Sequence, residues 1–246
     1  MVKSKLDVMQ WGTDRLRIGP WRGDARTAFL APVAGRPAAS ATIDRCLDVL
    51  AAKGYRSVIT AALSRSEQEP FTELGFVVHE RLHLLRHDLH QMPERSSLHL
   101  RRARPFDQGR VLDLDARAFD HFWRFDRGGL ADARQATPSS RFRVAEGYRN
   151  GCRGRTGVVG YAITGRAGDV GYLQRLAVDP DHHHRGIGTA LVTDSLWWSR
   201  RRGAAVVLVN TQETNVAAQS LYRRLGFEYE EHGLAVLERS LIEPWS

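Results

Sequence analysis

The feature that most constrains the fold is an alternation of strand-like and helix-like segments in the second half of the chain. The expected elements are, in order, a strand at 168–178, a helix at 188–202, a strand at 204–209, a helix at 215–225 and a hairpin of strands at 227–230 and 235–239. Each predicted helix places its apolar side chains on one face and ends at a glycine, Gly203 or Gly226. Such alternation predicts an α/β fold, in which helices cover a sheet.

Further elements are expected upstream, after a break near residues 91–97 that contains Pro93. They are strands at 97–101, 141–148 and 157–164 and helices at 107–119 and 130–137. Together with the C-terminal elements they predict a mixed sheet of about seven strands with helices on both faces.

The first ninety or so residues contain a weak echo of this pattern. A helix is expected at 43–52 before Gly54, a strand at 56–61, and a short helical turn at 71–74 before Gly75, followed by two strand-like stretches up to Leu89. The paired glycines are 21 residues apart here (54 to 75) and 23 apart in the second half (203 to 226). We interpret this as a duplication, with a partial domain at 1–92 and a complete one at 93–246; coincidence between two helix-strand-helix segments is the alternative.

The first chemical motif is the start of the predicted helix at 188–202. A polar loop with Gly186 and Gly188 precedes it, after the strand that ends at Val178. Free backbone N–H groups and the helix dipole favour an anion at such a position, and glycines allow close approach, so a diphosphate is the expected ligand. A P-loop is excluded because no lysine precedes Thr189, and a dinucleotide fingerprint would need a glycine at Leu191.

The second motif, Asn215-Val-Ala-Ala-Gln-Ser-Leu-Tyr-Arg-Arg-Leu-Gly-Phe227, is the more specific. The two motifs, in this order and separation, resemble those of the GCN5-related N-acetyltransferase (GNAT) family. The resemblance is strong over residues 168–237 and only topological over 97–164. It implies the GNAT acyl-CoA N-acyltransferase fold, with a degenerate GNAT-like N-terminal domain that has no cofactor site.

The resemblance also implies acetyl-CoA as co-substrate and acetyl transfer to a primary amine. The glycine loop would hold the pyrophosphate, the end of the preceding strand would pair with the pantetheine, and the second motif would line its thiol end. The implied cofactor-binding residues are Leu176, Ala177, Val178, His183, His184, Arg185, Gly186, Ile187, Gly188, Thr189, Ala190, Asn215, Ala218 and Tyr222. His183 stands where the family usually has Gln or Arg, and Arg185 is a substitute for phosphate contact.

In the family, the tyrosine of the second motif protonates the leaving thiolate, which corresponds here to Tyr222. An amine with a pKa near ~10 must also lose a proton before it attacks the thioester. The strand at 204–209 offers no glutamate, so Glu213 just beyond it is the first candidate for the base. Glu146, Asp169 and Tyr172, or a water relay, are alternatives.

Composition narrows the classes of function. The 36 basic and 28 acidic side chains give a net charge of +8, but the basic residues are spread along the chain, which argues against a dedicated nucleic-acid site. The two cysteines, Cys46 and Cys152, form no disulfide framework, and the run His182–His184 has no second cluster to complete a metal site. Without a stretch of 18 apolar residues we expect a cytoplasmic protein with no membrane association.

Several points stay open at this level. The acceptor can be a protein or a small molecule, and the aromatic stretch 119–125 is either its pocket wall or core. The protein can be a monomer or a homodimer. A non-catalytic acyl-CoA-binding regulatory module is the main alternative to an enzyme, and a cysteine nucleophile at Cys152 is a minor one.

Overall fold

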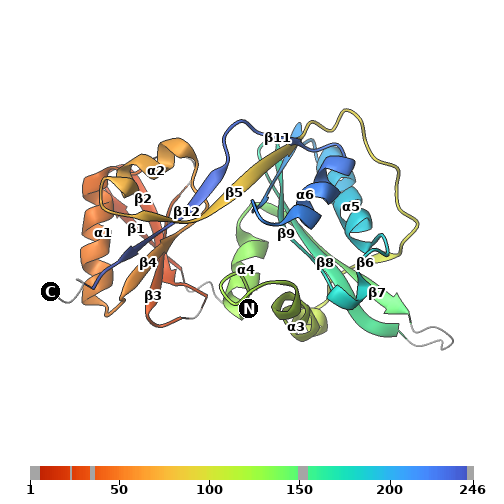
Figure 1. The fold of residues 1–246 in the computed structure, drawn as a ribbon, viewed down its shortest axis with the longest axis horizontal. Helices are drawn as coiled ribbons and strands as arrows, with labels where there is room; N and C mark the ends of the chain where they lie inside the picture. The colour runs from red at the N-terminus through yellow and green to blue at the C-terminus, as the bar shows by residue number, and fades with distance from the viewer. Residues whose placement is uncertain (1–5, 23, 34–36, 149–154, 243–246) are drawn as a thin grey trace.

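The computed structural model describes residues 6–22, 24–33, 37–148 and 155–242. In this part of the chain, twelve strands form one continuous sheet that runs through both halves of the molecule (Figure 1). Cys152 lies outside the described residues. Cys46 is fully buried in helix α1, and burial raises the pKa of its thiol to about 12.

The N-terminal half contains three strands that the sequence pattern had not indicated. Its elements are β1 (Asp7–Trp11), β2 (Asp14–Pro20), β3 (Thr27–Pro32), α1 (Ser40–Ala52), β4 (Ser57–Thr60), α2 (Arg65–Thr72) and β5 (Val77–His87). The helix and strand expected at 43–52 and 56–61 are confirmed. The two stretches expected up to Leu89 are instead a single long strand, β5, because both of its edges find partners.

The C-terminal half follows the predicted order closely. Its elements are β6 (Leu100–Arg102), the 3₁₀ turn η1 (Pro105–Asp107), α3 (Gln108–Ala118), α4 (Arg127–Gln135), β7 (Ser139–Tyr148), β8 (Arg155–Ala167), β9 (Val170–Val178), the 3₁₀ turn η2 (Pro180–His182), α5 (Ile187–Arg201), β10 (Val206–Gln212), α6 (Val216–Arg224), β11 (Glu228–Tyr229) and β12 (Leu234–Ser240). Seven strands therefore fall within residues 93–246, as expected, and α3, α4, α5 and α6 confirm the predicted helices.

The two halves exchange their last long strands. The strand order is β1-β2-β3-β4-β12-β5-β10-β9-β8-β7-β6, so β12 lies next to β4 of the N-terminal half and β5 lies next to β10 of the C-terminal half. Figure 1 shows β5 and β12 running side by side across the middle of the molecule. The division at residues 1–92 and 93–246 stays a prediction, with the loop between β5 and β6 spanning the proposed boundary.

The predicted hairpin at 227–230 and 235–239 is wrong. β11 pairs with β5 through Glu228–Arg86 and Tyr229–Leu85, and β12 pairs with β4 and with a different part of β5. Ala235, Val236 and Leu237 of β12 are buried, and Ala235 and Leu237 lie in the N-terminal core, which β12 reaches by pairing with β4 rather than with β11.

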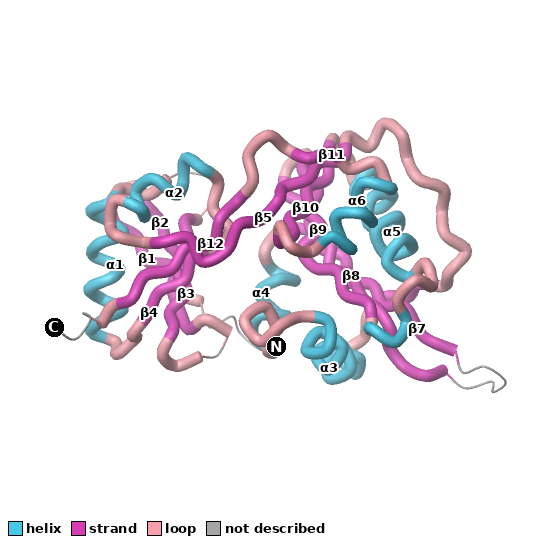
Figure 2. The backbone as a smooth tube through the Cα atoms, in the orientation of Figure 1, coloured by secondary structure: helices cyan, strands magenta, loops and turns pink. Residues whose placement is uncertain are grey.

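Helices cover both faces of the C-terminal sheet, as predicted (Figure 2). One core lies between the sheet and α5 and α6, and a second lies between the sheet and α3 and α4. Helix α5 packs closely on β8 because Gly160 has no side chain; a Cβ there would meet Ile187 Cγ2 at 2.7 Å. The N-terminal half has its own core around α1, α2 and β12, in which Phe71 packs against the edge of Phe76.

Candidate active site

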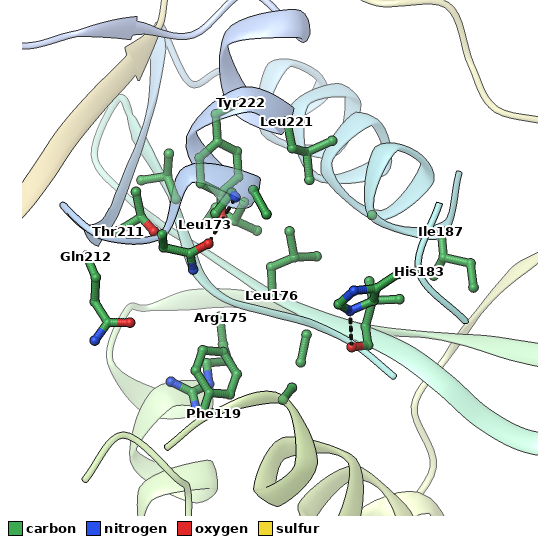
Figure 3. A pocket seen from close by; sticks show the side chains of 18 of the residues that line it. Phe119, Leu173, Arg175, Leu176, His183, Ile187, Thr211, Gln212, Leu221 and Tyr222 are labelled. Atoms are coloured by element: carbon green, nitrogen blue, oxygen red, sulfur yellow. Dashed lines mark hydrogen bonds between the residues drawn. The ribbon is translucent and has the colours of Figure 1, made fainter. Parts of the chain in front are cut away.

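The candidate site lies where two parallel strands separate. β9 and β10 pair only over Val170–Tyr172 and Val206–Leu208, although β9 continues to Val178 and β10 to Gln212. The facing edges therefore diverge, and a cavity of about 690 Å³ opens between them (Figure 3). A β-bulge at Gln174, between residues that pair with Thr164 and Ile163, adds to the bend of β9 beside the cavity.

The start of α5 forms one end of this cavity. Gly186 is the N-cap residue in a left-handed conformation (φ 74°), which glycine adopts without strain. The first helical hydrogen bond runs from Ala190 N–H to Gly186 O at 2.9 Å, so the N–H groups of residues 187–189 precede the ladder and are available to a ligand. A Cβ on Gly188 would meet Leu221 Cδ2 at 3.1 Å, a tight contact, so the glycine leaves space between this helix start and α6.

The loop before α5 is held in place by ion pairs. Arg117 on α3 donates hydrogen bonds to Asp179 at 2.8 Å and to Asp181 at 2.7 Å. The Nε2 atom of His183 lies 3.2 Å from the carbonyl oxygen of Val178. The loop thus has a fixed path from the end of β9 to the glycines of α5.

The second motif closes the opposite wall. The Asn215 side chain accepts a hydrogen bond from Ala218 N–H at 3.0 Å, which caps α6 and explains the asparagine at the motif's first position. Tyr222 is 5% exposed, lines the cavity and contacts the Phe227 ring with a centroid separation of 5.6 Å. Burial raises the pKa of its hydroxyl, an effect that the charge of Arg175 partly opposes.

The cavity brings together most of the residues singled out in the sequence. Those that line it are Leu176, Ala177, Val178, His183, His184, Gly186, Ile187, Gly188, Thr189, Asn215, Ala218 and Tyr222. Arg185 and Ala190 do not line it, because Arg185 is exposed in the loop and Ala190 is buried against the core.

The carboxylates proposed as the base lie elsewhere. Glu213 is exposed in the turn after β10 and does not line the cavity. Glu146 on β7 accepts a hydrogen bond from Arg101 at 2.8 Å, Asp169 is exposed in the turn before β9, and neither lines the cavity. Among the described residues that line the cavity, none is an aspartate or a glutamate.

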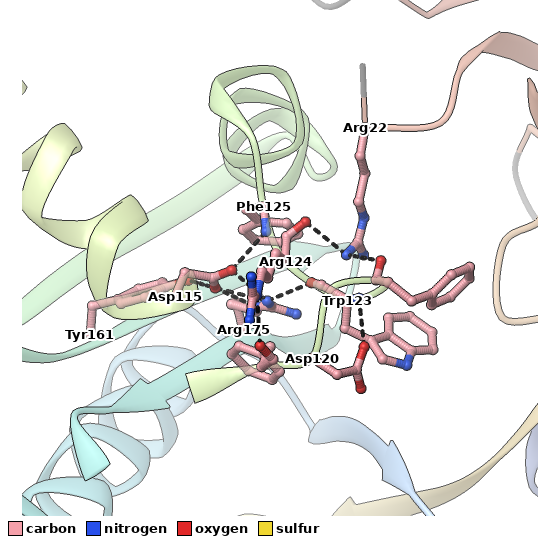
Figure 4. Close-up of polar contacts among 10 residues, drawn as sticks. Arg22, Asp115, Asp120, Trp123, Arg124, Phe125, Tyr161 and Arg175 are labelled. Carbon is pink, nitrogen blue, oxygen red and sulfur yellow. Dashed lines mark hydrogen bonds and ion pairs between the residues drawn. The ribbon is translucent and has the colours of Figure 1, made fainter. Parts of the chain in front are cut away.

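A buried polar cluster that the sequence analysis missed lies at the other end of the cavity (Figure 4). Asp115 is fully buried and accepts hydrogen bonds from Arg175 Nε at 2.9 Å and Arg175 Nη2 at 2.8 Å, from the Phe125 N–H and from the Tyr161 hydroxyl. The Arg175 guanidinium lies 3.4 Å from the centre of the Phe119 ring. An arginine at an inward-facing position of β9 was a signal that could have revealed this cluster.

The aromatic stretch 119–125 was interpreted as either a pocket wall or part of the core, and its residues divide between these two positions. Phe119, Trp123 and Phe125 line the cavity, whereas Phe122 packs on Trp21 and His79 and His121 is exposed. The lining at this end also includes Leu82 on β5 and Arg22, both from the N-terminal half. No pattern in the sequence pointed to either residue.

Within the described residues, no group of three or more histidine, cysteine, aspartate or glutamate side chains could hold a metal ion. No helix in that part of the chain is long and apolar enough to cross a membrane.

The separated parallel strands, the bulge and the open helix start together define the acyl-CoA N-acyltransferase fold class. The profile of the acetyltransferase (GNAT) family matches residues 110–227. The chain therefore carries a domain of the GNAT acetyltransferase family, and the expectation from the sequence is confirmed.

Curated relatives resemble parts of this chain. A mycothiol acetyltransferase of Saccharomonospora viridis is 32% identical over 134 residues, which are 51% of this chain and 44% of the relative. A [ribosomal protein bS18]-alanine N-acetyltransferase of Escherichia coli is 37% identical over 67 residues, which are 27% of this chain and 45% of the relative. The matches thus span less than half the length of these relatives.

Solved structures resemble nearly the whole fold. A tandem GNAT protein from the clavulanic acid biosynthesis pathway has a TM-score of 0.65 at 15% identity, over 94% of this chain and 80% of that chain. A GCN5-related N-acetyltransferase from Kribbella flavida has a TM-score of 0.62 at 14% identity, over 95% and 91%. At such identities the likeness concerns the fold, which is a GNAT fold preceded by a partial GNAT-like unit.

Proposed function

We propose that the protein is an N-acetyltransferase that transfers an acetyl group from acetyl-CoA directly to a primary amine of a protein or small molecule, within a ternary complex. The observation that carries this proposal is the separation of β9 from β10 next to an open helix start. A thioester cofactor that has both a long extended arm and a diphosphate fits these two features. The arm can lie along the strand edge, and the diphosphate can bind at the start of the helix.

The residues of the site would divide the work as follows. The N–H groups of Ile187, Gly188 and Thr189 bind the pyrophosphate, and the free edge of β9 at Leu176–Val178 binds the pantetheine as an added strand would. Acetyl-CoA supplies the activated acetyl carbon. The amine nitrogen forms a bond to that carbon, the carbon–sulfur bond breaks, and the amine gives up a proton.

Tyr222 would stabilise the departing thiolate. Its raised pKa keeps the hydroxyl protonated at neutral pH. Full proton transfer from a phenol to a thiolate whose conjugate thiol has a pKa near ~8.5 is uphill, so the main contribution is a hydrogen bond to the sulfur. For the amine proton, water is the acceptor that the cavity suggests, since its described lining holds no aspartate or glutamate; Glu213 stays a prediction that needs a relay into the site.

The first experiment is calorimetric titration with acetyl-CoA of the wild type and of Gly188→Trp, whose side chain would fill the pyrophosphate position. Gly109→Trp is the matched control, because Gly109 also lies in the first turn of a helix but is exposed, with open space around its Cβ position. We expect saturable binding by the wild type and by the control. We expect no binding by Gly188→Trp, with a melting temperature equal to that of the wild type as evidence that the variant is folded. Absence of binding by the folded wild type would refute the proposal.

Tyr222→Phe then tests the chemistry. We expect kcat to fall about 10²-fold with little change in the Kd for acetyl-CoA, since one transition-state hydrogen bond is lost.

A non-catalytic acyl-CoA-binding module is the second candidate, and the lack of a carboxylate in the described cavity lining favours it. It predicts tight binding of acetyl-CoA with slow hydrolysis that no amine accelerates. A single amine that accelerates release of CoA, and appears acetylated by mass spectrometry, would exclude it.

A further inference from the structure

Two arginines from different halves of the chain line the same end of the cavity. Arg175 comes from β9, and Arg22 comes from the turn after β2. The charge of Arg175 is matched by Asp115, which is bound to it through two hydrogen bonds. This end of the cavity therefore contains two arginine side chains. Arg175 is bound to a carboxylate, and Arg22 has contacts of a different kind.

The guanidinium of Arg22 is held by neutral groups. It donates hydrogen bonds to the backbone carbonyls of Phe122 at 2.8 Å and Arg124 at 3.0 Å, and it lies 4.3 Å from the centre of the Trp21 ring and 5.4 Å from that of Trp123. The described residues include no carboxylate in an ion pair with it. Asp115, Asp126 and Asp120 act on its charge through space. Its printed hydrogen bonds go to backbone carbonyls, so the guanidinium lines the cavity without a bound carboxylate among the described residues.

The placement of Arg22 also has a conformational cost. Its φ of 47° lies in the left-handed region, which non-glycine residues rarely adopt. Burial, followed by the charge of Arg175, lowers the pKa of its guanidinium to about 9, although the charges of Asp115, Asp126 and Asp120 act in the opposite direction. An anion in contact with Arg22 would offset both the desolvation and the repulsion between the two arginines.

The anion of acetyl-CoA does not account for this position. Its diphosphate belongs at the start of α5, beyond Val178, and Arg175 is three residues earlier on β9, which separates the two by about 10 Å of extended strand. Arg22 lies further along, beside Trp123 and Phe125. This is the end of the cavity from which the acceptor would approach.

We propose that the acceptor amine carries a carboxylate group, and that Arg22 binds this carboxylate while the amine faces the acetyl group. The proposal rests on the proposed acetyltransferase function.

The remainder of the acceptor has room beyond Arg22. The same residue lines a second cavity of about 230 Å³, whose walls combine the aromatic rings of Trp21, Phe29 and Phe125 with Asp126 and Asp132. An aromatic amino acid is therefore a suitable first probe, with a short linear amino acid beside it.

The test compares matched amines at saturating acetyl-CoA, with CoA release and mass spectrometry as readouts. The pairs are L-phenylalanine with L-phenylalaninamide, and 4-aminobutyrate with its amide, in which three carbons separate the amine from the varied group. We expect kcat/KM to be about ten- to a hundredfold higher for the carboxylate of each pair, the range for one charge-assisted hydrogen bond.

Variants assign the preference to Arg22. In Arg22→Gln, the ratio of kcat/KM for the carboxylate to kcat/KM for its amide should fall toward one, mainly through a higher KM for the carboxylate. Arg22→Lys should retain part of the preference for the carboxylate. Arg15→Gln is the control, because Arg15 is an exposed arginine on β2 and its loss changes the net charge equally. Calorimetry should give the same Kd for acetyl-CoA in all four proteins.

The outcomes separate the two proposals. If acetyl-CoA binds and amides are acetylated as fast as carboxylates, or if the wild type acetylates neither carboxylate, the inference about the acceptor is overturned while the cofactor site stands. If acetyl-CoA does not bind to the folded wild type, the proposed function falls first.

Discussion

The buried carboxylate of Asp115 allows a quantitative test of how the proposed acceptor end of the cavity is built. The side chain is 0% exposed and receives four hydrogen bonds, from Arg175 (two), Phe125 and Tyr161. It therefore fixes α3, the loop after it and two strands of the sheet to one another (Figure 4).

Asp115→Asn removes the charge but keeps the shape. The guanidinium of Arg175, 8% exposed, then stays buried without its counter-ion. The NH₂ group of the asparagine also faces the N–H donors that bound the carboxylate, so their hydrogen bonds are lost. Loss of one partner of a buried pair costs about 3–5 kcal/mol. For a chain of this length, at roughly 2–4 °C per kcal/mol, the melting temperature should fall by about 6–20 °C.

Asp194→Asn is the matched control. Asp194 on α5 accepts two hydrogen bonds from Arg141, at 2.7 and 2.8 Å, but its side chain is 19% exposed and water can replace the lost contacts. We expect a cost below about 2 kcal/mol, nearer to that of exposed pairs. Urea unfolding followed by circular dichroism measures both variants. A cost for Asp115→Asn no larger than that for Asp194→Asn would refute the assignment of Asp115 as the buried anchor.

Three further predictions follow from single contacts. Gly226→Ala should lower stability by about 1–2 kcal/mol in thermal unfolding, because residue 226 has φ 87° and a Cβ there would lie 3.2 Å from His87 Nε2; an unchanged melting temperature would contradict this. The hydrogen bond from Arg101 lowers the pKa of Asp107, so this carboxylate stabilises the fold above its unfolded pKa near ~4, and stability is lost as pH falls through the lower folded value; Asp107→Asn should therefore be less stable at pH 7 and show a shallower acid loss in urea titrations. Glu213→Gln should leave kcat within about twofold, since the side chain is exposed outside the cavity, and a loss of tenfold or more would restore it as the base.

The local elements and much of the cavity lining beside α5 and α6 could be predicted from the sequence because their causes are local. The glycines of α5 and the capping asparagine of α6 act on residues within one helical turn, so a short window contains the whole signal. The strand pairings at the centre of the sheet could not be predicted in this way. β12 carries the same apolar run, Leu234 to Leu237, whether it pairs with β11 or with β4, and only the packing of both halves decides between them.

Most of the proposed acceptor end was missed for a related reason, although the aromatic stretch at 119–125 had been noted. Arg22, Leu82 and Arg175 are far apart in the chain, and each has a common alternative role on a surface or in a core. Only the alternation of β9 marked Arg175 as unusual, since a lone charge at an inward position needs a partner such as Asp115. No comparable pattern surrounds Arg22.

The exchange of strands suggests why a half without the glycine loop is useful to this protein. β3 and β4 pair in parallel along all four residues of β4, so the N-terminal strands stay together where β9 and β10 separate, and no equivalent gap opens. The same half sends β5 to the edge of β10, where Leu82 joins the cavity lining, and it supplies Arg22 from the turn after β2. We infer that the N-terminal half acts on the acceptor and leaves the cofactor to the C-terminal half. Acceptor preference should then respond to changes in the N-terminal half that leave the affinity for acetyl-CoA unaltered.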